Sequence, residues 1–421
     1  MNFRFLPVVA LLSLVLVASG ITAQRRDVFV APRDHAAIRY SATDPTDEVA
    51  TLNRKLADGS VSLKFDPVSG YLRSVLEALK IPVESQALVF SKTSFQAPRI
   101  RIDNPRAVYF NDTVSVGWVR GGEVLEVSAV DPKQGVIFYT VDQKDGATPT
   151  FSRNDTCLAC HLSWDTLGVP GLVVQSVHPL PDEKSYVNGY TTIHGSLLEQ
   201  RWGGWWVTGN HGGARHMGNI PVMPEEKGKA KLANPRAPLR SVEGMFDLTG
   251  YPTPHSDVVA MMVLAHQTQM TNLIIRAGWE ARVSEANPSE DAALRTREAA
   301  ADLVDYMLFV YEAPLAGPMQ GSSGFAATFS AQGPRDAKGR SLRDLDLRSR
   351  MFRYPCSYMI HTEAFDALPA AAKTAVYTRL WDILSGREKH QRYSRLTAAD
   401  RRAIVEILRD TKKDLPAYFM R

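Results

Sequence analysis

The chain has 421 residues, of which 44% are hydrophobic and 22% are charged, the composition of an ordinary globular protein. A net charge of +4 is too weak to indicate a nucleic-acid partner, and three cysteines are too few for a scaffold held together by disulfides. The length suggests two or three domains.

The first 23 residues have the pattern of a secretory signal peptide that is removed from the mature protein. Arg4 supplies the positive charge, residues 6–17 form an uncharged apolar run, and small residues follow as far as Ala23. The alternative is a retained anchor, for which this apolar run barely reaches spanning length. No later stretch approaches about 18 uncharged apolar residues. We therefore expect a periplasmic mature chain with no stable membrane insertion.

Residues 24–245 are expected to form a β-rich region. Residues 24–54 are polar and suggest an extended lead-in, whereas residues 69–79 have helical spacing. Residues 87–142 carry short runs rich in Val, Phe, Tyr and Thr, separated by turn residues, and so predict a β-meander. Further short strands are expected at 169–177, 190–194 and 205–208, followed by an irregular loop at 210–240.

Residues 246–421 are expected to be mainly α-helical. Helical spacing predicts helices at 256–284, 288–312, 340–351, 364–385 and 397–413. Ser256 is the candidate N-cap of the first of these helices, and Pro288-Ser289 opens the second. The segment 335–350 is dense in Arg and Asp and predicts a solvated, ion-paired helix. The predicted fold class is therefore α+β, with a β-rich N-terminal half followed by a mainly α-helical C-terminal half.

The most specific chemistry lies at residues 157–161, which read Cys-Leu-Ala-Cys-His. Thiols at positions i and i+3 can each form a thioether with one vinyl group of a haem, and the imidazole of the next residue can bind the iron. We expect Cys157, Cys160 and His161 to hold one covalent haem c, with His161 as an axial ligand. A single motif disfavours a di-haem protein.

Three other uses of this motif remain as alternatives. A thioredoxin-like dithiol usually has an aromatic residue before the first cysteine, where this chain has Thr156. A structural zinc site needs further cysteines or paired histidines, and a disulfide between positions i and i+3 is unusual. The third cysteine, Cys356, has no partner nearby in sequence and is expected to be a free, buried thiol.

The five residues from Cys157 to His161 resemble the attachment motif of c-type cytochromes. This resemblance implies covalent haem and a role outside the cytoplasm, and it specifies the cofactor rather than an activity. The segments VPGLVVQSV, QRWGGWWVTG and RHMGN are also similar to large, mostly uncharacterised exported bacterial proteins that carry one haem motif. That wider resemblance implies no particular reaction.

The ligand on the opposite side of the iron decides between carrier and enzyme. An electron-transfer cytochrome usually has Met or His there. Our preferred candidate is Met217, because it lies in a Gly-rich loop whose backbone can approach a porphyrin closely. The alternatives are Met223, one of the histidines His211, His216 and His266, or an open position.

A tryptophan-rich segment precedes that loop. Trp202, Trp205 and Trp206 either stack along a haem edge or anchor a core strand. Arg215 or Arg201 is expected to pair with the haem propionates, because an Arg–carboxylate pair is a strong charge-assisted contact.

These features predict an exported mono-haem cytochrome that transfers electrons to or from a redox partner protein. The chain is much longer than a simple carrier needs. A haem-dependent oxidoreductase with an open iron site is therefore an alternative, with His211, His216 or His266 as acid–base groups. A haem-based sensor is the third possibility.

Overall fold

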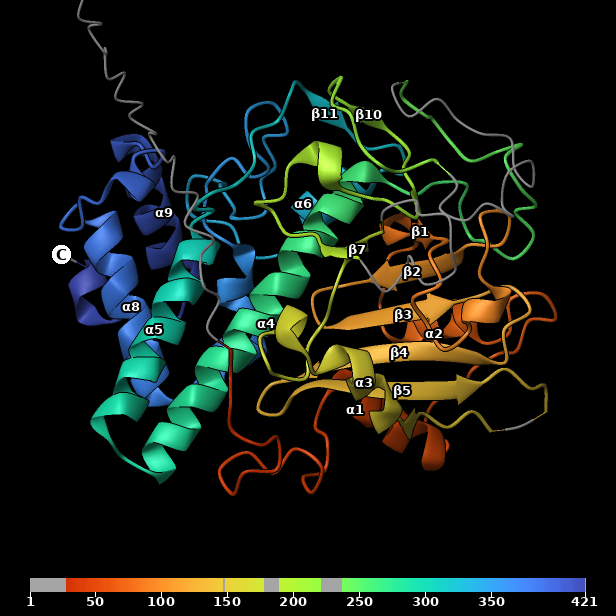
Figure 1. The fold of residues 1–421 in the computed structure, drawn as a ribbon, viewed down its shortest axis with the longest axis horizontal. Helices are drawn as coiled ribbons and strands as arrows, with labels where there is room; N and C mark the ends of the chain where they lie inside the picture. The colour runs from red at the N-terminus through yellow and green to blue at the C-terminus, as the bar shows by residue number, and fades with distance from the viewer. Residues whose placement is uncertain (1–27, 147, 178–188, 221–236, 421) are drawn as a thin grey trace, which may run out of the picture.

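The computed structural model describes residues 28–146, 148–177, 189–220 and 237–420. The expected signal peptide and Met223 lie outside the described residues. A β-sheet forms most of the N-terminal half and helices form the C-terminal half (Figure 1), which confirms the predicted α+β class. The division at residues 245 and 246 stays a prediction, because helix α4 (Val258–Ala286) contributes side chains to both hydrophobic clusters of the protein.

Within the described residues the main sheet has seven antiparallel strands in the order β6-β5-β4-β3-β2-β1-β9. Its strands are β1 (Ala87–Val89), β2 (Arg106–Phe110), β3 (Val114–Trp118), β4 (Val124–Asp131), β5 (Gly135–Asp142), β6 (Ser152–Arg153) and β9 (Trp205–Trp206). The predicted β-meander is thus β1 to β5. The remaining strands form two small sheets, β7 (Gln175–Ser176) with β8 (Tyr190–Thr191), and β10 (Asn210–His211) with β11 (Met319–Gln320).

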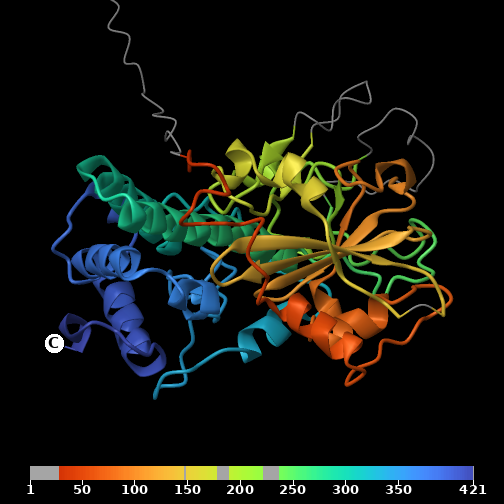
Figure 2. The same cartoon turned by 90° about the horizontal axis from the view of Figure 1, so that it is seen from below.

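One face of the sheet is a hydrophobic core. Tyr109, Val116, Val127 and Tyr139 stand side by side across β2 to β5, and all four are buried. Side chains alternate between the faces of a strand, so every second residue of the meander joins this core. Helices α1 (Glu48–Ala57) and α2 (Leu72–Ala78) cover it, and Figure 2 shows them on one side of the sheet.

Helix α1 corrects the predicted extended lead-in. The Asp47 side chain caps the helix by accepting the N–H groups of Val49 and Ala50, and its other oxygen accepts the hydroxyl of Tyr139 at 2.6 Å. Val49, Leu52 and Leu56 are buried. The polar composition of this segment belongs to the exposed side of an amphipathic helix, which explains why the sequence suggested an extended chain.

Helix α4 is the central element of the helical half. Asp257 caps it, one residue after the predicted cap Ser256. It is the one helix in the described part of the chain long and apolar enough to cross a membrane, and its most apolar window is completely buried in the fold. It packs against α5 (Glu290–Met307), which begins at the predicted cap Ser289. A buried core helix explains this apolar stretch. The expectation that no stretch after residue 23 approaches spanning length was wrong for this helix.

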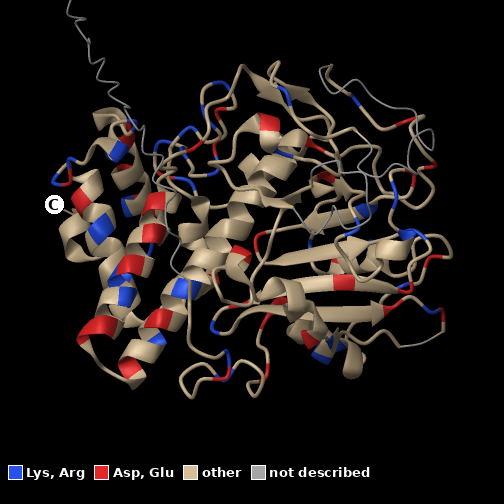
Figure 3. Ribbon diagram, viewed as in Figure 1, with Lys and Arg blue, Asp and Glu red and all other residues tan. Residues whose placement is uncertain are grey.

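Around this pair lie α6 (Phe325–Ala331), α7 (Glu363–Asp366), α8 (Ala370–Leu384) and α9 (Ala398–Thr411). Charged residues are frequent on α5, α8, α9 and the loops, and the central strands carry few of them (Figure 3). These helices therefore present charged faces to solvent, whereas most of α4 and the sheet lie in the interior.

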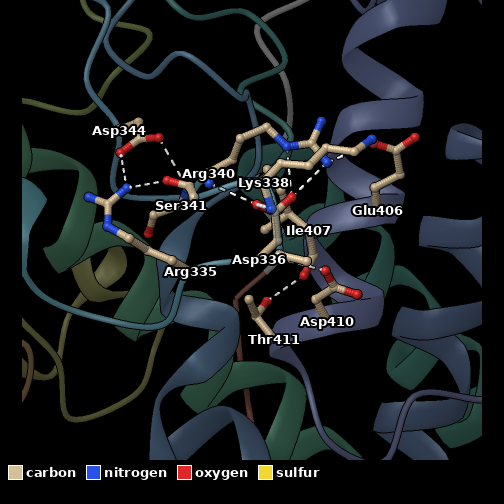
Figure 4. Close-up of polar contacts among 12 residues, drawn as sticks. Arg335, Asp336, Lys338, Arg340, Ser341, Asp344, Glu406, Ile407, Asp410 and Thr411 are labelled. Atoms are coloured by element: carbon tan, nitrogen blue, oxygen red, sulfur yellow. Dashed lines mark hydrogen bonds and ion pairs between the residues drawn. The ribbon is translucent and has the colours of Figure 1, made fainter.

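The helix predicted at 340–351 does not form, and the segment is irregular. Its charged residues pair with one another and with α9 instead of along a helix of their own. Arg340 contacts both Asp336 and Glu406, each at 2.6 Å, and Lys338 contacts Glu406 at 2.8 Å (Figure 4). The ion pairing was predicted correctly, but long-range pairing with α9 replaced the local helical pattern.

Candidate haem-attachment site

The cysteine motif lies where the chain leaves the edge of the main sheet. After β6, the side chain of Asn154 accepts the N–H of Thr156 and starts the turn η3 (Asp155–Cys157), which leads directly into α3 (Leu158–His161). Leu158 is buried in the core that includes the sheet. This buried side chain anchors the short helix that carries Cys160 and follows directly after Cys157.

The two cysteines carry free thiols, Cys157 half-buried and Cys160 exposed. Burial, assisted by the carboxylate of Glu126, raises the pKa of the Cys157 thiol to about 11. A reactive dithiol needs the opposite shift, since the thiolate is the attacking species. The described residues contain no group of three His, Cys, Asp or Glu placed to hold a metal ion. Neither dithiol redox chemistry nor a structural zinc site gains support.

The imidazole of His161 is held in one orientation. Its Nδ1 lies 2.9 Å from the carbonyl oxygen of Gly171, and the N–H of Gly171 donates back to the carbonyl of His161 at 2.9 Å. If Nδ1 carries the proton, Nε2 has the lone pair, and it has no hydrogen-bond partner within the described part of the chain. Burial lowers the pKa of His161 and favours the neutral ring. A neutral imidazole with its other nitrogen bound to a carbonyl is the usual state of a metal-ligating histidine.

Helix α4 fixes the loop that orients His161. The side chain of Asn272 accepts the N–H of Leu172 at 2.9 Å and donates to its carbonyl at 2.8 Å. A Cβ at Gly171 would lie 2.3 Å from the Asn272 side chain, so only glycine fits at this approach. The β-rich and helical halves of the protein therefore meet at the motif.

The second face of the sheet lies beside α3, opposite to α1 and α2 (Figure 2). The ring of Phe138 in β5 is 4.7 Å from the ring of His161. Next to it lie Ser115, Gly117, Ser128 and Thr140 on β3, β4 and β5, which we call the small-residue face. Ser115 and Thr140 are half-buried. These four positions carry small side chains or none, whereas Phe138 is a large, buried side chain of the same face.

An ion pair crosses this face. Arg106 in β2 contacts Glu126 in β4 at 2.6 Å, and the guanidinium lies directly over Gly117, where a Cβ would be 2.3 Å from Nη2. Ser94 also donates to Glu126, at 2.6 Å. The charges of Arg106 and Glu126 both contribute to the electrostatic environment of His161. Sequence reasoning missed this pair; a glycine inside a strand, which often marks close approach of another group, was the only signal.

The fold does not bring Met217 together with His161. The N–H of Met217 donates to the carbonyl of Arg201, and that of Asn219 donates to the carbonyl of Trp205 in β9. Strand β9 is five strand spacings from β5, about 24 Å in a flat sheet. The exposed Arg215 lies in the same loop. Both assignments, Met217 as distal ligand and Arg215 as propionate partner, stay predictions that need a different arrangement of this loop.

The other candidate residues lie in two buried clusters. His211 and His216 pack edge to face at 4.8 Å, and Nε2 of each lacks a hydrogen-bond partner among the described residues. His266 is fully buried in a stack with His194, to which its Nδ1 lies at 3.1 Å, and its Nε2 lies 2.8 Å from the hydroxyl of Ser357. Both ring nitrogens of His266 are therefore engaged within the protein, as expected of a core histidine.

The tryptophan-rich segment is part of the core. Trp202, Trp205 and Trp206 are buried, and Trp206 packs edge to face against Phe90. The guanidinium of Arg201 is buried and donates to the carbonyl oxygens of neighbouring residues in its own loop. The core interpretation accounts for these residues without a haem edge. Cys356 is likewise buried with a free thiol, as predicted.

No protein-family model matches this chain, and comparison with the curated proteins and with the solved structures also finds no match. The assignment of function therefore depends on the chemistry of the motif and its surroundings.

Proposed function

We propose that this protein is an exported c-type cytochrome that holds one haem through Cys157, Cys160 and His161 and transfers electrons in the periplasm. The observation that carries the proposal is the state of His161. Its Nδ1 is bound to the carbonyl of Gly171, its Nε2 has no hydrogen-bond partner among the described residues, and two unbridged thiols lie nearby, Cys157 at the end of η3 and Cys160 in α3. This donor set fits covalent haem. A haem bound there supplies an iron that changes between Fe(II) and Fe(III) by gaining or losing one electron.

The protein contributes attachment, orientation and electrostatics. Leu158 lies between the two cysteines and anchors this part of the chain in the core, and Asn272 holds the loop whose carbonyl orients the imidazole. Phe138 packs against the ring of His161 and limits its rotation. The exposed position of Cys160 places one edge of the site near solvent, where a redox partner protein can approach. These features suit transfer of electrons between proteins.

The test is haem attachment in cysteine variants expressed with export to the periplasm. We expect the wild type to retain haem on a denaturing gel, and Cys157→Ser and Cys160→Ser to lose most of the stain, since each removes one thioether. Cys356→Ala is the matched control, because it removes a thiol outside the motif and should stain fully. A wild-type protein without covalent haem, or cysteine variants that stain at full intensity, would overturn the proposal.

A second candidate, a haem-dependent oxidoreductase with an open iron position, is favoured by one observation. The loop of Met217 is anchored at β9, far from the imidazole of His161. With an open position, the reduced protein binds carbon monoxide, and Met217→Ala leaves the optical spectrum unchanged. Met420→Ala, at an exposed methionine, is the control. A Met-to-iron charge-transfer band that disappears only in Met217→Ala would instead establish Met217 as the ligand.

A further inference from the structure

We propose that Arg106 binds a propionate of the haem and that the haem edge lies along the small-residue face of the sheet. This inference rests on the proposed function, since it assumes a haem at Cys157, Cys160 and His161. It assigns to Arg106 the role that the sequence suggested for Arg215 or Arg201.

The guanidinium of Arg106 has an N–H group without a hydrogen-bond partner among the described residues. A guanidinium has five N–H donors in a planar fork. In the described residues one of them, on Nη2, contacts Glu126, whereas Nε is buried and has no hydrogen-bond partner. Buried donors in native proteins nearly always find an acceptor. The geometry therefore points to an acceptor that the protein chain itself does not supply.

The carboxylate of Glu126 already has several hydrogen-bonding partners. Its carboxylate accepts the hydroxyl of Ser94 and the side-chain N–H of Gln96, in addition to its contact with Arg106. Glu126 thus holds one edge of the guanidinium in place and has little capacity to turn toward the others. A second carboxylate, placed on the free edge, is the best match, since Arg binds carboxylates through two parallel hydrogen bonds.

Strand register places Arg106 near the motif. His161 packs against Phe138 in β5, Thr140 lies two residues further along the same face, and Thr140 is paired with Glu126, which contacts Arg106. The ion pair therefore lies on the face of the sheet that His161 contacts, and Gly117, Ser128 and Thr140 around it carry small side chains or none. A flat group attached at α3 can extend along this face, past Phe138, toward Arg106.

Two other arginines, Arg153 and Arg201, already have partners within the protein. Arg153 pairs with Asp155 at 3.0 Å and donates to the carbonyl of Tyr40. Arg201 donates to backbone carbonyls of its own loop. Arg106 combines proximity to the motif with a buried N–H that lacks a protein partner.

The assignment has a consequence for the reduction potential. Reduction adds an electron to the iron, so a nearby cation favours the reduced state and a nearby carboxylate opposes it. Arg106→Gln should therefore lower the midpoint potential, and Glu126→Gln should raise it. For Arg106→Gln we expect at least a tenfold shift of the equilibrium toward the oxidised form, which is about 59 mV for a one-electron couple.

The experiment is a redox titration of the purified full-length holoprotein as a function of pH. In Arg106→Gln the unpaired propionate should also titrate closer to neutral pH, so that the potential acquires a pH dependence that is absent in the wild type. Arg106→Lys should give an intermediate potential, because it keeps the charge and loses the planar fork. Arg99→Gln is the matched control, since Arg99 is exposed and pairs with Glu123 on the surface.

A purely structural role would lower haem content in Arg106→Gln and Glu126→Gln alike and would not move their potentials in opposite directions. Gly117→Val is a second variant, because its side chain displaces the guanidinium while leaving the charge in the protein; it should lower the potential. Full haem content with a potential like that of Arg99→Gln overturns the assignment of Arg106 alone. Absence of covalent haem in the wild type overturns the proposed function and this inference with it.

Discussion

The side chain of Asn272 links the helical half to the proposed haem ligand through one loop. It makes two hydrogen bonds to the backbone of Leu172, next to the glycine whose carbonyl orients His161. Neither a sequence motif nor the spacing of residues identifies Asn272, which lies more than a hundred positions from the cysteines. Its role follows from the direction in which α4 crosses the sheet.

We predict that Asn272→Ala lowers the free energy of unfolding by about 1–3 kcal/mol, because it leaves the N–H and the carbonyl of the half-buried Leu172 without these partners. It should also broaden the optical bands of the attached haem, since the loop that orients His161 becomes less restrained. Urea denaturation measures the first effect and the spectrum of the reduced protein measures the second. Asn53→Ala, which removes hydrogen bonds to Phe151 far from α4, is the control and should leave the spectrum unchanged.

The segment 335–344 shows how an element can be replaced by long-range contacts. Asp336 is almost completely buried, and its carboxylate accepts the backbone N–H groups of Lys338 and Arg340 as well as the Arg340 side chain. These contacts hold the loop in a turn, and Arg340 then reaches Glu406 on α9 (Figure 4). The alternating charges favoured a helix in isolation, but a buried carboxylate that binds three donors stabilises the turn more.

Two substitutions in this cluster should differ in their effect on stability. Asp336→Ala should lower the free energy of unfolding by about 1–3 kcal/mol, because it removes several hydrogen bonds to a buried carboxylate. Lys338→Ala should change it by less than about 1 kcal/mol, because its pair with Glu406 is largely exposed. Thermal and urea unfolding of the two variants measure the difference. Equal effects would show that the cluster is held by its exposed ion pairs.

At the scale of the whole molecule, buried histidines couple folding to pH. Burial lowers the pKa of His266 to about 3, below the ordinary value near 6.5. Between these two pH values the unfolded chain binds the proton and the folded chain does not. The free energy of unfolding therefore rises with pH across this window, and stability is lost as the pH falls below about 6.5.

We predict that the stability of the wild type declines between pH 6.5 and pH 4 with a contribution from His266 of up to about 1.4 kcal/mol per pH unit. His266→Gln should reduce this slope, even if the variant is less stable at pH 7, because the titrating group is gone. His390→Gln, at an exposed histidine, should keep the wild-type slope. Urea denaturation at a series of pH values provides the measurement, and a slope unchanged in His266→Gln would contradict the prediction.

The elements predicted correctly were those specified by residues close together in the chain. The β-meander shows in the alternation that places Tyr109, Val116 and Val127 on one face, and α5 begins at the predicted cap. The same holds for the cysteine motif, since two thiols and an imidazole within five residues define their chemistry locally. The extended chain predicted for 24–54 and the helix predicted at 340–351 were wrong, because burial against distant partners decided those segments. A local sequence pattern does not contain such contacts.

The sequence by itself determined the α+β class, the start of α5 and the motif from Cys157 to His161 on which the proposed cofactor depends. Only the tertiary structure decided what surrounds the motif. Strand register placed Arg106, Gly117 and Glu126 in one line across the sheet, and the anchoring of its loop at β9 placed Met217 away from His161. Such contacts join residues far apart in the chain, and they exist only after the strands have paired and α4 has packed against them.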